Sequence, residues 1–235
     1  MRRRHRRQLN LIFDADDTLW DLNIHFIEAE QAFCKAAIEA GSEARREQLA
    51  AMIRRCELEV IQTHGYGRGP YLLALSRVVR ELSSDGDFQR QLQVQIDRIG
   101  QRLIERHCEP LPGVERTLCE LASRHRLLLF TKGQREEQLR KLDRSGLGAQ
   151  FSHVGTPREK NVDSYLSLIS SANLDPSNTH MIGNSPRSDI NPAIRAGLGA
   201  VFIAHQHTWV MEQEEIEKPE RVVALGYFAA LLEVF

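Results

Sequence analysis

The hydrophobic pattern opens with a short apolar run that stops abruptly at acidic residues. The run is LNLIF, residues 9–13, and DADDT follows it at residues 14–18. A brief, continuous apolar run bounded by polar residues is typical of a buried strand. Ligands of open α/β sheets bind beyond the carboxyl ends of the strands, so the acidic loop is where chemistry is expected.

The next part of the chain, from about Asn23 to His107, has a different periodicity. Apolar residues recur there at spacings of three and four, which predicts about four amphipathic helices. The spacing is seen at Phe26, Ala29, Phe33 and Ala37, and again at Leu72, Leu75, Val78, Val79 and Leu82. Turn-forming residues at 41–42, 64–70 and 83–86 are predicted to separate the helices.

Helices and strands alternate after residues 111–113. Strands are predicted for RLLLFT (126–131), FSHVG (151–155), THMIG (179–183) and AVFIA (200–204), with helices ending near Arg124 and beginning at Gln134, Val162 and Asp189. This alternation predicts an α/β fold with a three-layer, Rossmann-like parallel sheet core. Because the helical block follows the first strand, it is predicted to be an inserted α-helical cap. The expected parts are a basic tail (1–8), the α/β core (9–20 and 109–235) and the helical cap (21–108).

Composition narrows the classes of function. The 235 residues are 42% hydrophobic and 27% charged, as in soluble globular proteins. A formal net charge of −1 gives no global attraction to nucleic acid or to anionic membranes, and the arginines within residues 2–7 are expected to form a solvated tail. No apolar stretch approaches the roughly 18 residues of a membrane-spanning helix or forms a signal-peptide core. We therefore expect a cytoplasmic monomer or homodimer that binds neither nucleic acid nor membrane. The four cysteines have no metal-binding spacing and are expected to be reduced and mostly buried.

The acidic loop concentrates Asp14, Asp16 and Asp17 within four residues. Such crowding of carboxylates is unfavourable unless a cation or hydrogen bonds offset it. An isolated cluster of this kind would be interpreted as a helix cap or a solvated loop. Its place at the end of the first predicted strand favours a binding site instead.

Three further strand ends carry matching chemistry. Thr131-Lys132-Gly133 offers a hydroxyl and backbone N–H groups that suit an anion. Lys160, after the strand that ends near residue 155, suits phosphate or the crowded carboxylates. After THMIG, Asn184 and Asp189 supply oxygen ligands of the kind that Mg²⁺ prefers. The four loops predict one site for an anion and a cation together.

These four segments, in this order, resemble the motifs of the haloacid dehalogenase superfamily of phosphatases and phosphotransferases. The first motif of that family, hhhDxDxT, matches residues 11–18, and its second, a strand ending in Ser or Thr, matches residues 127–131. Its third, a basic residue, matches Lys160, and its fourth, Gly-Asp-x-x-x-x-Asp, matches residues 183–189 with Asn184 in place of the aspartate. The resemblance extends from about Leu9 to the end of the chain.

The resemblance implies a Mg²⁺-dependent phosphatase that hydrolyses a small phosphorylated metabolite. Asp14 would be the nucleophile that forms an aspartyl-phosphate, and Asp16 would protonate the leaving oxygen and then deprotonate water. Lys160 would stabilise the phosphoryl group together with the second motif. The implied substrate-binding residues are Thr131, Lys132 and Gly133, and the implied metal ligands are Asp14, Asp16, Asn184 and Asp189.

Several alternatives stay open at this point. A sugar-phosphate mutase shares all the core motifs of the resemblance and differs in its cap. A catalytically weak, phosphate-binding or regulatory member is suggested by Asn184, because an amide supplies no charge to a metal. A phosphonate hydrolase would need a cap lysine for a Schiff base, and Lys35 is the candidate. His205 and His207 have an H-x-H spacing but are assigned no role.

Overall fold

The computed structural model describes residues 8–105 and 108–235. The chain divides into two compact units, one made of Met1–Asn23 with Cys108–Phe235 and the other of Ile24–His107. We call the first the core unit and the second the helical unit. The basic run predicted as a tail lies outside the described residues, apart from residue 8.

The core unit is built on a parallel sheet. Among the described residues, six strands run in the order β3-β2-β1-β4-β5-β6. Their bounds are β1 Asn10–Phe13, β2 Arg126–Phe130, β3 His153–Gly155, β4 Thr179–Gly183, β5 Gly199–Ile203 and β6 Val222–Leu225. The strand order reverses at β1, where Phe13 is in register with Leu129 of β2 and Ile182 of β4. The loops after these strands therefore meet at one edge of the sheet, as the sequence predicted.

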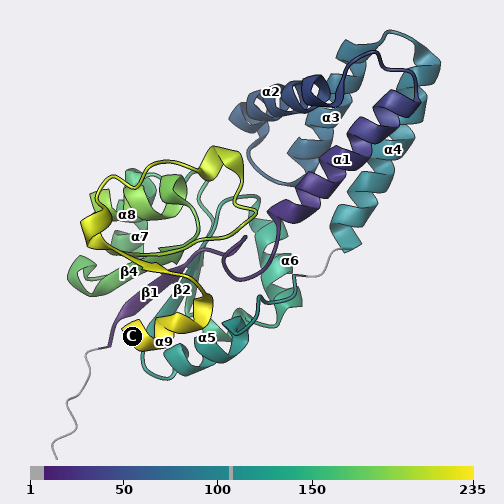
Figure 1. The fold of residues 1–235 in the computed structure, drawn as a ribbon. Helices are drawn as coiled ribbons and strands as arrows, with labels where there is room; N and C mark the ends of the chain where they lie inside the picture. The colour runs from purple at the N-terminus through teal and green to yellow at the C-terminus, as the bar shows by residue number, and fades with distance from the viewer. Residues whose placement is uncertain (1–7, 106–107) are drawn as a thin grey trace, which may run out of the picture. The chain divides into compact units, whose positions relative to one another are not determined.

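Helices cover both faces of this sheet. They are α5 Val114–Ala122, α6 Arg135–Ser145, α7 Val162–Ser171, α8 Asn191–Arg195 and α9 Leu231–Val234. Figure 1 shows α7 and α8 on one side of the strands and α5 and α9 on the other. Residues of β1 alternate accordingly, because Phe13 belongs to the apolar cluster of α5 and α9 whereas Ile12 packs in the cluster of α7. The predicted three-layer α/β fold is confirmed.

Two elements differ from the sequence prediction. The edge strand β6 was missed although VVAL, residues 222–225, is a short apolar run, because no helical pattern precedes it to continue the alternation of helices and strands. The helix predicted to begin at Asp189 was wrong at its start, because a π-helical turn, Pro186–Ile190, comes first and α8 begins only at Asn191. Asp189 therefore lies in a widened turn, a local geometry that often occurs at functional sites.

The helical unit has its own hydrophobic core. Its described residues form four helices, as predicted, with bounds α1 Asn23–Glu39, α2 Arg46–His64, α3 Arg68–Leu82 and α4 Gly86–Glu105. Phe33, Ile53, Leu75 and Leu92, one from each helix, are buried together. Among the described residues, no helix is both long and apolar enough to cross a membrane. The cysteines are unpaired, and Cys119 alone of the four is exposed.

Candidate active site

The loop after β1 extends the sheet by one residue and then turns sharply. The Asp14 N–H donates to the Ile182 carbonyl at 2.9 Å, so Asp14 is fixed directly beside the end of β4. The Leu19 N–H donates to the Ala15 carbonyl at 2.8 Å, and Asp17 has a left-handed backbone with φ 59°. This compact turn holds the Asp14 and Asp17 side chains in a buried position and leaves Asp16 partly exposed.

Asp14, Lys160 and Asp189 form a buried ionic cluster. The Lys160 ammonium contacts Asp14 Oδ1 and lies 2.7 Å from Asp189 Oδ1. Lys160 comes from the loop after β3, and Asp189 from the π-helical turn after β4. The structure thus brings together three residues that the sequence placed at separate strand ends.

Charge in this cluster is unevenly balanced. Burial raises the pKa of Asp14 to about 7, although the Lys160 ammonium opposes the shift. Burial likewise raises the pKa of Asp189 against the effect of Lys160. Burial would lower the pKa of Lys160, but the two carboxylates together raise it above its usual value. Two buried carboxylates therefore share one ammonium, which leaves an excess negative charge when both are ionised.

A glycine keeps Asp189 in reach of Lys160. Gly183 is the last residue of β4, and a Cβ atom there would lie only 2.2 Å from Asp189 Oδ2. That same oxygen accepts the Ser185 N–H at 3.0 Å, which holds the carboxylate across the turn. The close approach of Asp189 thus requires a residue without a side chain at position 183.

Asn184 presents its amide oxygen to the cluster. Thr18 Oγ1 lies 3.2 Å from Asn184 Oδ1 and 3.3 Å from Asp14 Oδ2. Asn184 Nδ2 donates to Thr208 Oγ1 at 2.8 Å, and that hydroxyl in turn donates to the His205 carbonyl. Because the Thr208 hydroxyl proton is already used, the hydroxyl must accept from the amide nitrogen, which directs the amide oxygen toward the Thr18 hydroxyl that lies between it and Asp14.

The predicted metal-ligand side chains are compatible with Mg²⁺. Asp14, Asn184 and Asp189 supply hard oxygen atoms, the ligand type that this cation prefers. The excess negative charge of the buried cluster is a second reason to expect a metal ion here, because a divalent cation would offset that charge. The fourth predicted ligand, Asp16, has its carboxylate bound to other side chains, so its backbone carbonyl is the oxygen that it can offer to a metal.

Asp16 is held by side chains from outside its own motif. Lys141 Nζ lies 2.6 Å from both carboxylate oxygens. Trp20 Nε1 donates to Oδ1 at 2.7 Å, and Gln138 Nε2 donates to Oδ2 at 3.1 Å. Lys141 and Gln138 lie on α6 and were missed as site residues. The available signal was the scarcity of lysine, since five of the 31 basic residues are lysines and three of them lie in this site.

The loop after β2 is tied to Asp16 through the same glutamine. Thr131 is buried, and its N–H donates to the Gly155 carbonyl at 3.1 Å. Gln138 Nε2 also donates to the Lys132 carbonyl at 2.6 Å. Gly133 has φ 119°, and a Cβ atom there would lie 2.8 Å from Gln138 Nε2. A glycine is therefore required both by the backbone and by the approach of the glutamine.

The segment after β5, residues 204–217, crosses the ends of the strands. Glu212 Oε1 lies 2.5 Å from Lys132 Nζ, and its other oxygen accepts from Ser185 Oγ at 2.6 Å. Burial raises the pKa of Glu212, but the charge of Lys132 and these hydrogen bonds together lower it below the usual value. Sequence reasoning missed Glu212, because an irregular segment has no periodicity that indicates where a side chain points.

A second acidic group lies beside this segment. The ligand atoms of Asp17, Asp21 and His205 are all within 4.8 Å of one another. Asp17 Oδ1 accepts the N–H groups of Leu22 and Asn23, and His205 Nε2 lies 2.9 Å from Asp21 Oδ1. Asp17 therefore shapes the entry to α1.

Comparison with known proteins agrees with this geometry. A family model for haloacid dehalogenase-like hydrolases matches residues 10–197. The chain is 26% identical, over 215 residues, to a glyceraldehyde 3-phosphate phosphatase of Methanothermobacter thermautotrophicus, covering 88% of this chain and 90% of that protein. A haloacid dehalogenase-like hydrolase from Xanthomonas campestris has a similar structure, with a TM-score of 0.79, 23% identity and coverage of 97% of this chain and 91% of the other. A 2-haloacid dehalogenase from Pseudomonas syringae aligns with a TM-score of 0.64, 19% identity and coverage of 97% and 98%. This chain belongs to the haloacid dehalogenase-like hydrolases.

Proposed function

We propose that the protein is a Mg²⁺-dependent phosphatase that hydrolyses a small phosphorylated metabolite through an aspartyl-phosphate. The observation that carries the proposal is the buried cluster in which Asp14 and Asp189 share the Lys160 ammonium. The arrangement combines a nucleophilic carboxylate, a cation for phosphoryl oxygens and excess charge for a metal. The glyceraldehyde 3-phosphate phosphatase relative supports a small phosphorylated substrate.

In the first half-reaction, a carboxylate oxygen of Asp14 attacks phosphorus. The bond from phosphorus to the leaving oxygen breaks, and the leaving oxygen keeps the electron pair of that bond. Asp16 donates a proton to the same oxygen. Lys160, the Thr131 hydroxyl and the backbone of Lys132 and Gly133 stabilise the charge on the other phosphoryl oxygens. Mg²⁺, when held by the oxygens of Asp14, Asn184 and Asp189 and the Asp16 carbonyl, would withdraw further charge from them.

In the second half-reaction, Asp16 works as a base. It removes a proton from a water molecule, whose oxygen attacks phosphorus. The bond from phosphorus to the Asp14 oxygen breaks, inorganic phosphate leaves and the Asp14 carboxylate is restored. Asp16 then carries the proton needed for the next leaving group, so the cycle balances.

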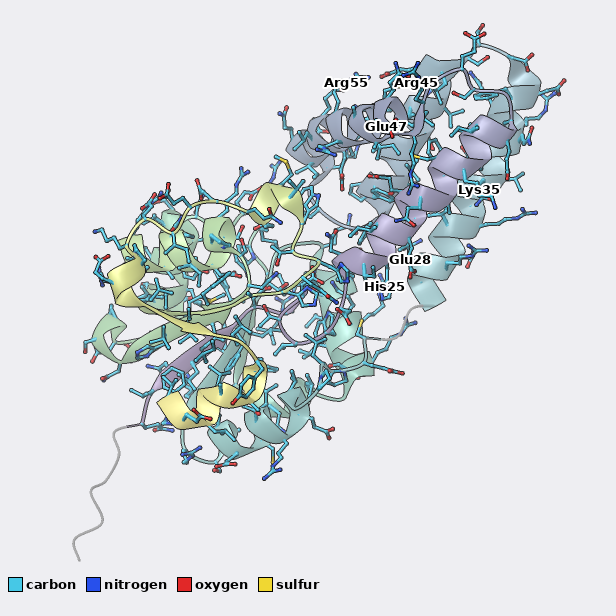
Figure 2. All side chains as sticks on the ribbon, in the orientation of Figure 1. His25, Glu28, Lys35, Arg45, Glu47 and Arg55 are labelled. Atoms are coloured by element: carbon cyan, nitrogen blue, oxygen red, sulfur yellow. The ribbon has the colours of Figure 1, made fainter. Side chains whose placement is uncertain are left out.

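We assign substrate selection to the helical unit as a cap. Its one lysine, Lys35, does not suit the Schiff base that a phosphonate hydrolase would need. The Lys35 side chain is 76% exposed on α1 and lies 3.8 Å from Glu39, and Figure 2 shows its position on the helix. An amine nucleophile of that kind is activated by desolvation or by a neighbouring cation, and Lys35 has an acidic neighbour and water around it.

The proposal is tested by phosphate release from p-nitrophenyl phosphate, with and without Mg²⁺. Wild type should turn over with Mg²⁺, and Asp14→Asn should lose at least about 10³-fold in kcat because the nucleophile is gone. Asp163→Asn is the matched control, since Asp163 is exposed on α7. Undiminished turnover by Asp14→Asn, in protein free of deamidation and of contaminating phosphatase, would refute the proposal.

A panel of triose and hexose phosphates separates hydrolysis from phosphoryl transfer within a sugar. We expect inorganic phosphate to appear in step with loss of the substrate. Movement of the phosphoryl group between positions of one sugar, without free phosphate, would instead identify a mutase.

A further inference from the structure

The Asp16 carboxylate is held in an unusually complete set of contacts. Among the described residues, each of its oxygens faces the Lys141 ammonium and one further N–H donor, from Trp20 on Oδ1 and from Gln138 on Oδ2. A carboxylate offers about four lone-pair directions, and these contacts use all four while Asp16 is ionised. One donor must therefore release its oxygen when Asp16 takes up the proton that it later transfers. The orientation of this side chain is therefore specified from both sides.

Lys141 is the charged donor among these three side chains, and it is paired with Asp16 in a largely buried environment. Its side chain is only 11% exposed and that of Asp16 is 20% exposed. Burying an ammonium is unfavourable unless it is paired, and Asp16 is the carboxylate that pairs it. A buried ion pair is weak evidence for stability, but it can fix one arrangement of side chains over others.

Helix α6 positions both Lys141 and Gln138 against Asp16. Gln138 and Lys141 are three residues apart, so they lie on the same face of the helix, and both are buried. The neighbouring Arg140 is exposed. The helix thus offers two donors to Asp16, whereas its three arginines, Arg135, Arg140 and Arg144, are exposed.

We propose that Lys141 is a positioning residue that orients Asp16 for proton exchange with the leaving oxygen. The inference rests on the phosphatase function proposed above, in which Asp16 is the acid and then the base. Proton transfer requires the acid within hydrogen-bond reach of the leaving oxygen, so a misdirected Asp16 slows the reaction. Loss of Lys141 removes contacts to both Asp16 oxygens and leaves one donor on each.

The expected signature is a dependence on the leaving group. In Lys141→Met, kcat/KM for an alkyl phosphate such as glycerol phosphate should fall about 10–100-fold, because this constant reports the first half-reaction and an alkoxide needs the proton. With p-nitrophenyl phosphate, kcat/KM should stay within about threefold, because nitrophenolate leaves without a proton. Any loss in the second half-reaction lowers kcat equally for both substrates, KM should not rise for either, and Lys141→Arg should recover part of the alkyl activity.

The control is Arg140→Met, which makes the same change on the exposed face of α6. It should leave both substrates unaffected. Thermal midpoints of all variants show whether the protein is folded, and Lys141→Gln, which keeps a neutral NH₂ donor group, replaces Lys141→Met if the latter does not fold. Crystal structures of wild type and of the folded variant report the orientation of Asp16 directly.

Three results would overturn the inference. Equal losses of kcat/KM for alkyl and aryl phosphates would indicate a general structural role, and a rise in KM alone would indicate that Lys141 attracts the phosphate. An unchanged Asp16 orientation in the variant crystal would show that Lys141 does not position it. If wild type hydrolyses no phosphomonoester, the proposed function fails, while the crystal structures still decide whether Lys141 orients Asp16.

Discussion

Each unit of the molecule buries carboxylates, and the two groups differ in how their charge is compensated. In the core unit, Asp14 and Asp189 converge from two loops on the Lys160 ammonium. In the helical unit, Glu57 on α2 is partly buried near Glu30, and the cation that acts on it, Arg54, is exposed. Burial raises the pKa of both Asp14 and Glu57 to about 7.

The comparison shows that a raised pKa does not by itself identify a catalytic residue. Burial raises the pKa of Asp14 and of Glu57 to a similar value. Of the two, only Asp14 lies at a strand end, where a buried lysine and a second carboxylate are its neighbours. In the core unit, the unfavourable burial accords with the site for a cation and an anion proposed above. In the helical unit, we expect the unfavourable burial of Glu57 to reduce stability.

The largest effect should come from removing the shared ammonium. Lys160→Met leaves two buried carboxylates facing each other, so we expect at least about 10³-fold loss of kcat and about 3–5 kcal/mol loss of metal-free stability. Steady-state kinetics and urea denaturation check the two effects. Lys218→Met, at an exposed lysine, is the control. Full turnover and unchanged stability in Lys160→Met would show that the buried ammonium does not compensate Asp14 and Asp189, and the core unit would then not differ from the helical unit in this respect.

A smaller effect should follow from adding charge to the core cluster. In Asn184→Asp, the Mg²⁺ concentration for half-maximal activity should fall about tenfold, because a carboxylate replaces an amide oxygen beside Asp14. The metal-free thermal midpoint should fall as well, since the new charge repels Asp14 and Asp189. Titrations of activity and of thermal midpoint with Mg²⁺ measure both.

An unchanged or higher Mg²⁺ requirement in Asn184→Asp would place residue 184 outside the metal shell. Turnover by the variant combined with none by wild type would instead support the interpretation of this chain as a catalytically weak member.

The smallest effect should come from the helical unit. Because the pKa of Glu57 is raised from 4.5 to about 7 on folding, the folded protein binds its proton more tightly, and stability is lost as pH rises through this window. Glu57→Gln should therefore be more stable than wild type by about 1–2 kcal/mol at pH 8 and equal to it below about pH 4.5. Urea denaturation at the two pH values measures the difference, with exposed Glu43→Gln as control. A variant that is no more stable at pH 8 would show that Glu57 is not destabilising.

The sequence was informative where a side chain lies in the loop or turn that follows a strand. The proximity of Asp14, Lys160 and Asp189 was predicted because parallel strands end at one edge, so position in the chain predicts position in space. The same rule cannot find Lys141, which lies within α6, or Glu212, which lies in an irregular segment. Their contacts depend on where a helix and a loop pack, which local patterning does not encode.

Secondary structure was likewise predicted where the local sequence pattern is regular and missed where it is not. Strands buried on both faces, such as β1 and β2, give continuous apolar runs and were predicted. The edge strand β6 also has a short apolar run, but an irregular segment precedes it in place of a crossover helix, so the alternating pattern did not extend to it. The π-helical turn at Pro186–Ile190 adds a residue that the helical periodicity does not predict.

The contact between Gly183 and Asp189 has a consequence for how this lineage can diverge. Any side chain at position 183 meets the Asp189 carboxylate, so a single substitution there displaces a residue six positions away. Replacement of this glycine is therefore incompatible with the present geometry of the ionic cluster. Among divergent relatives, a side chain at the aligned position would mark a sequence that has abandoned this arrangement, even where every charged residue is still present.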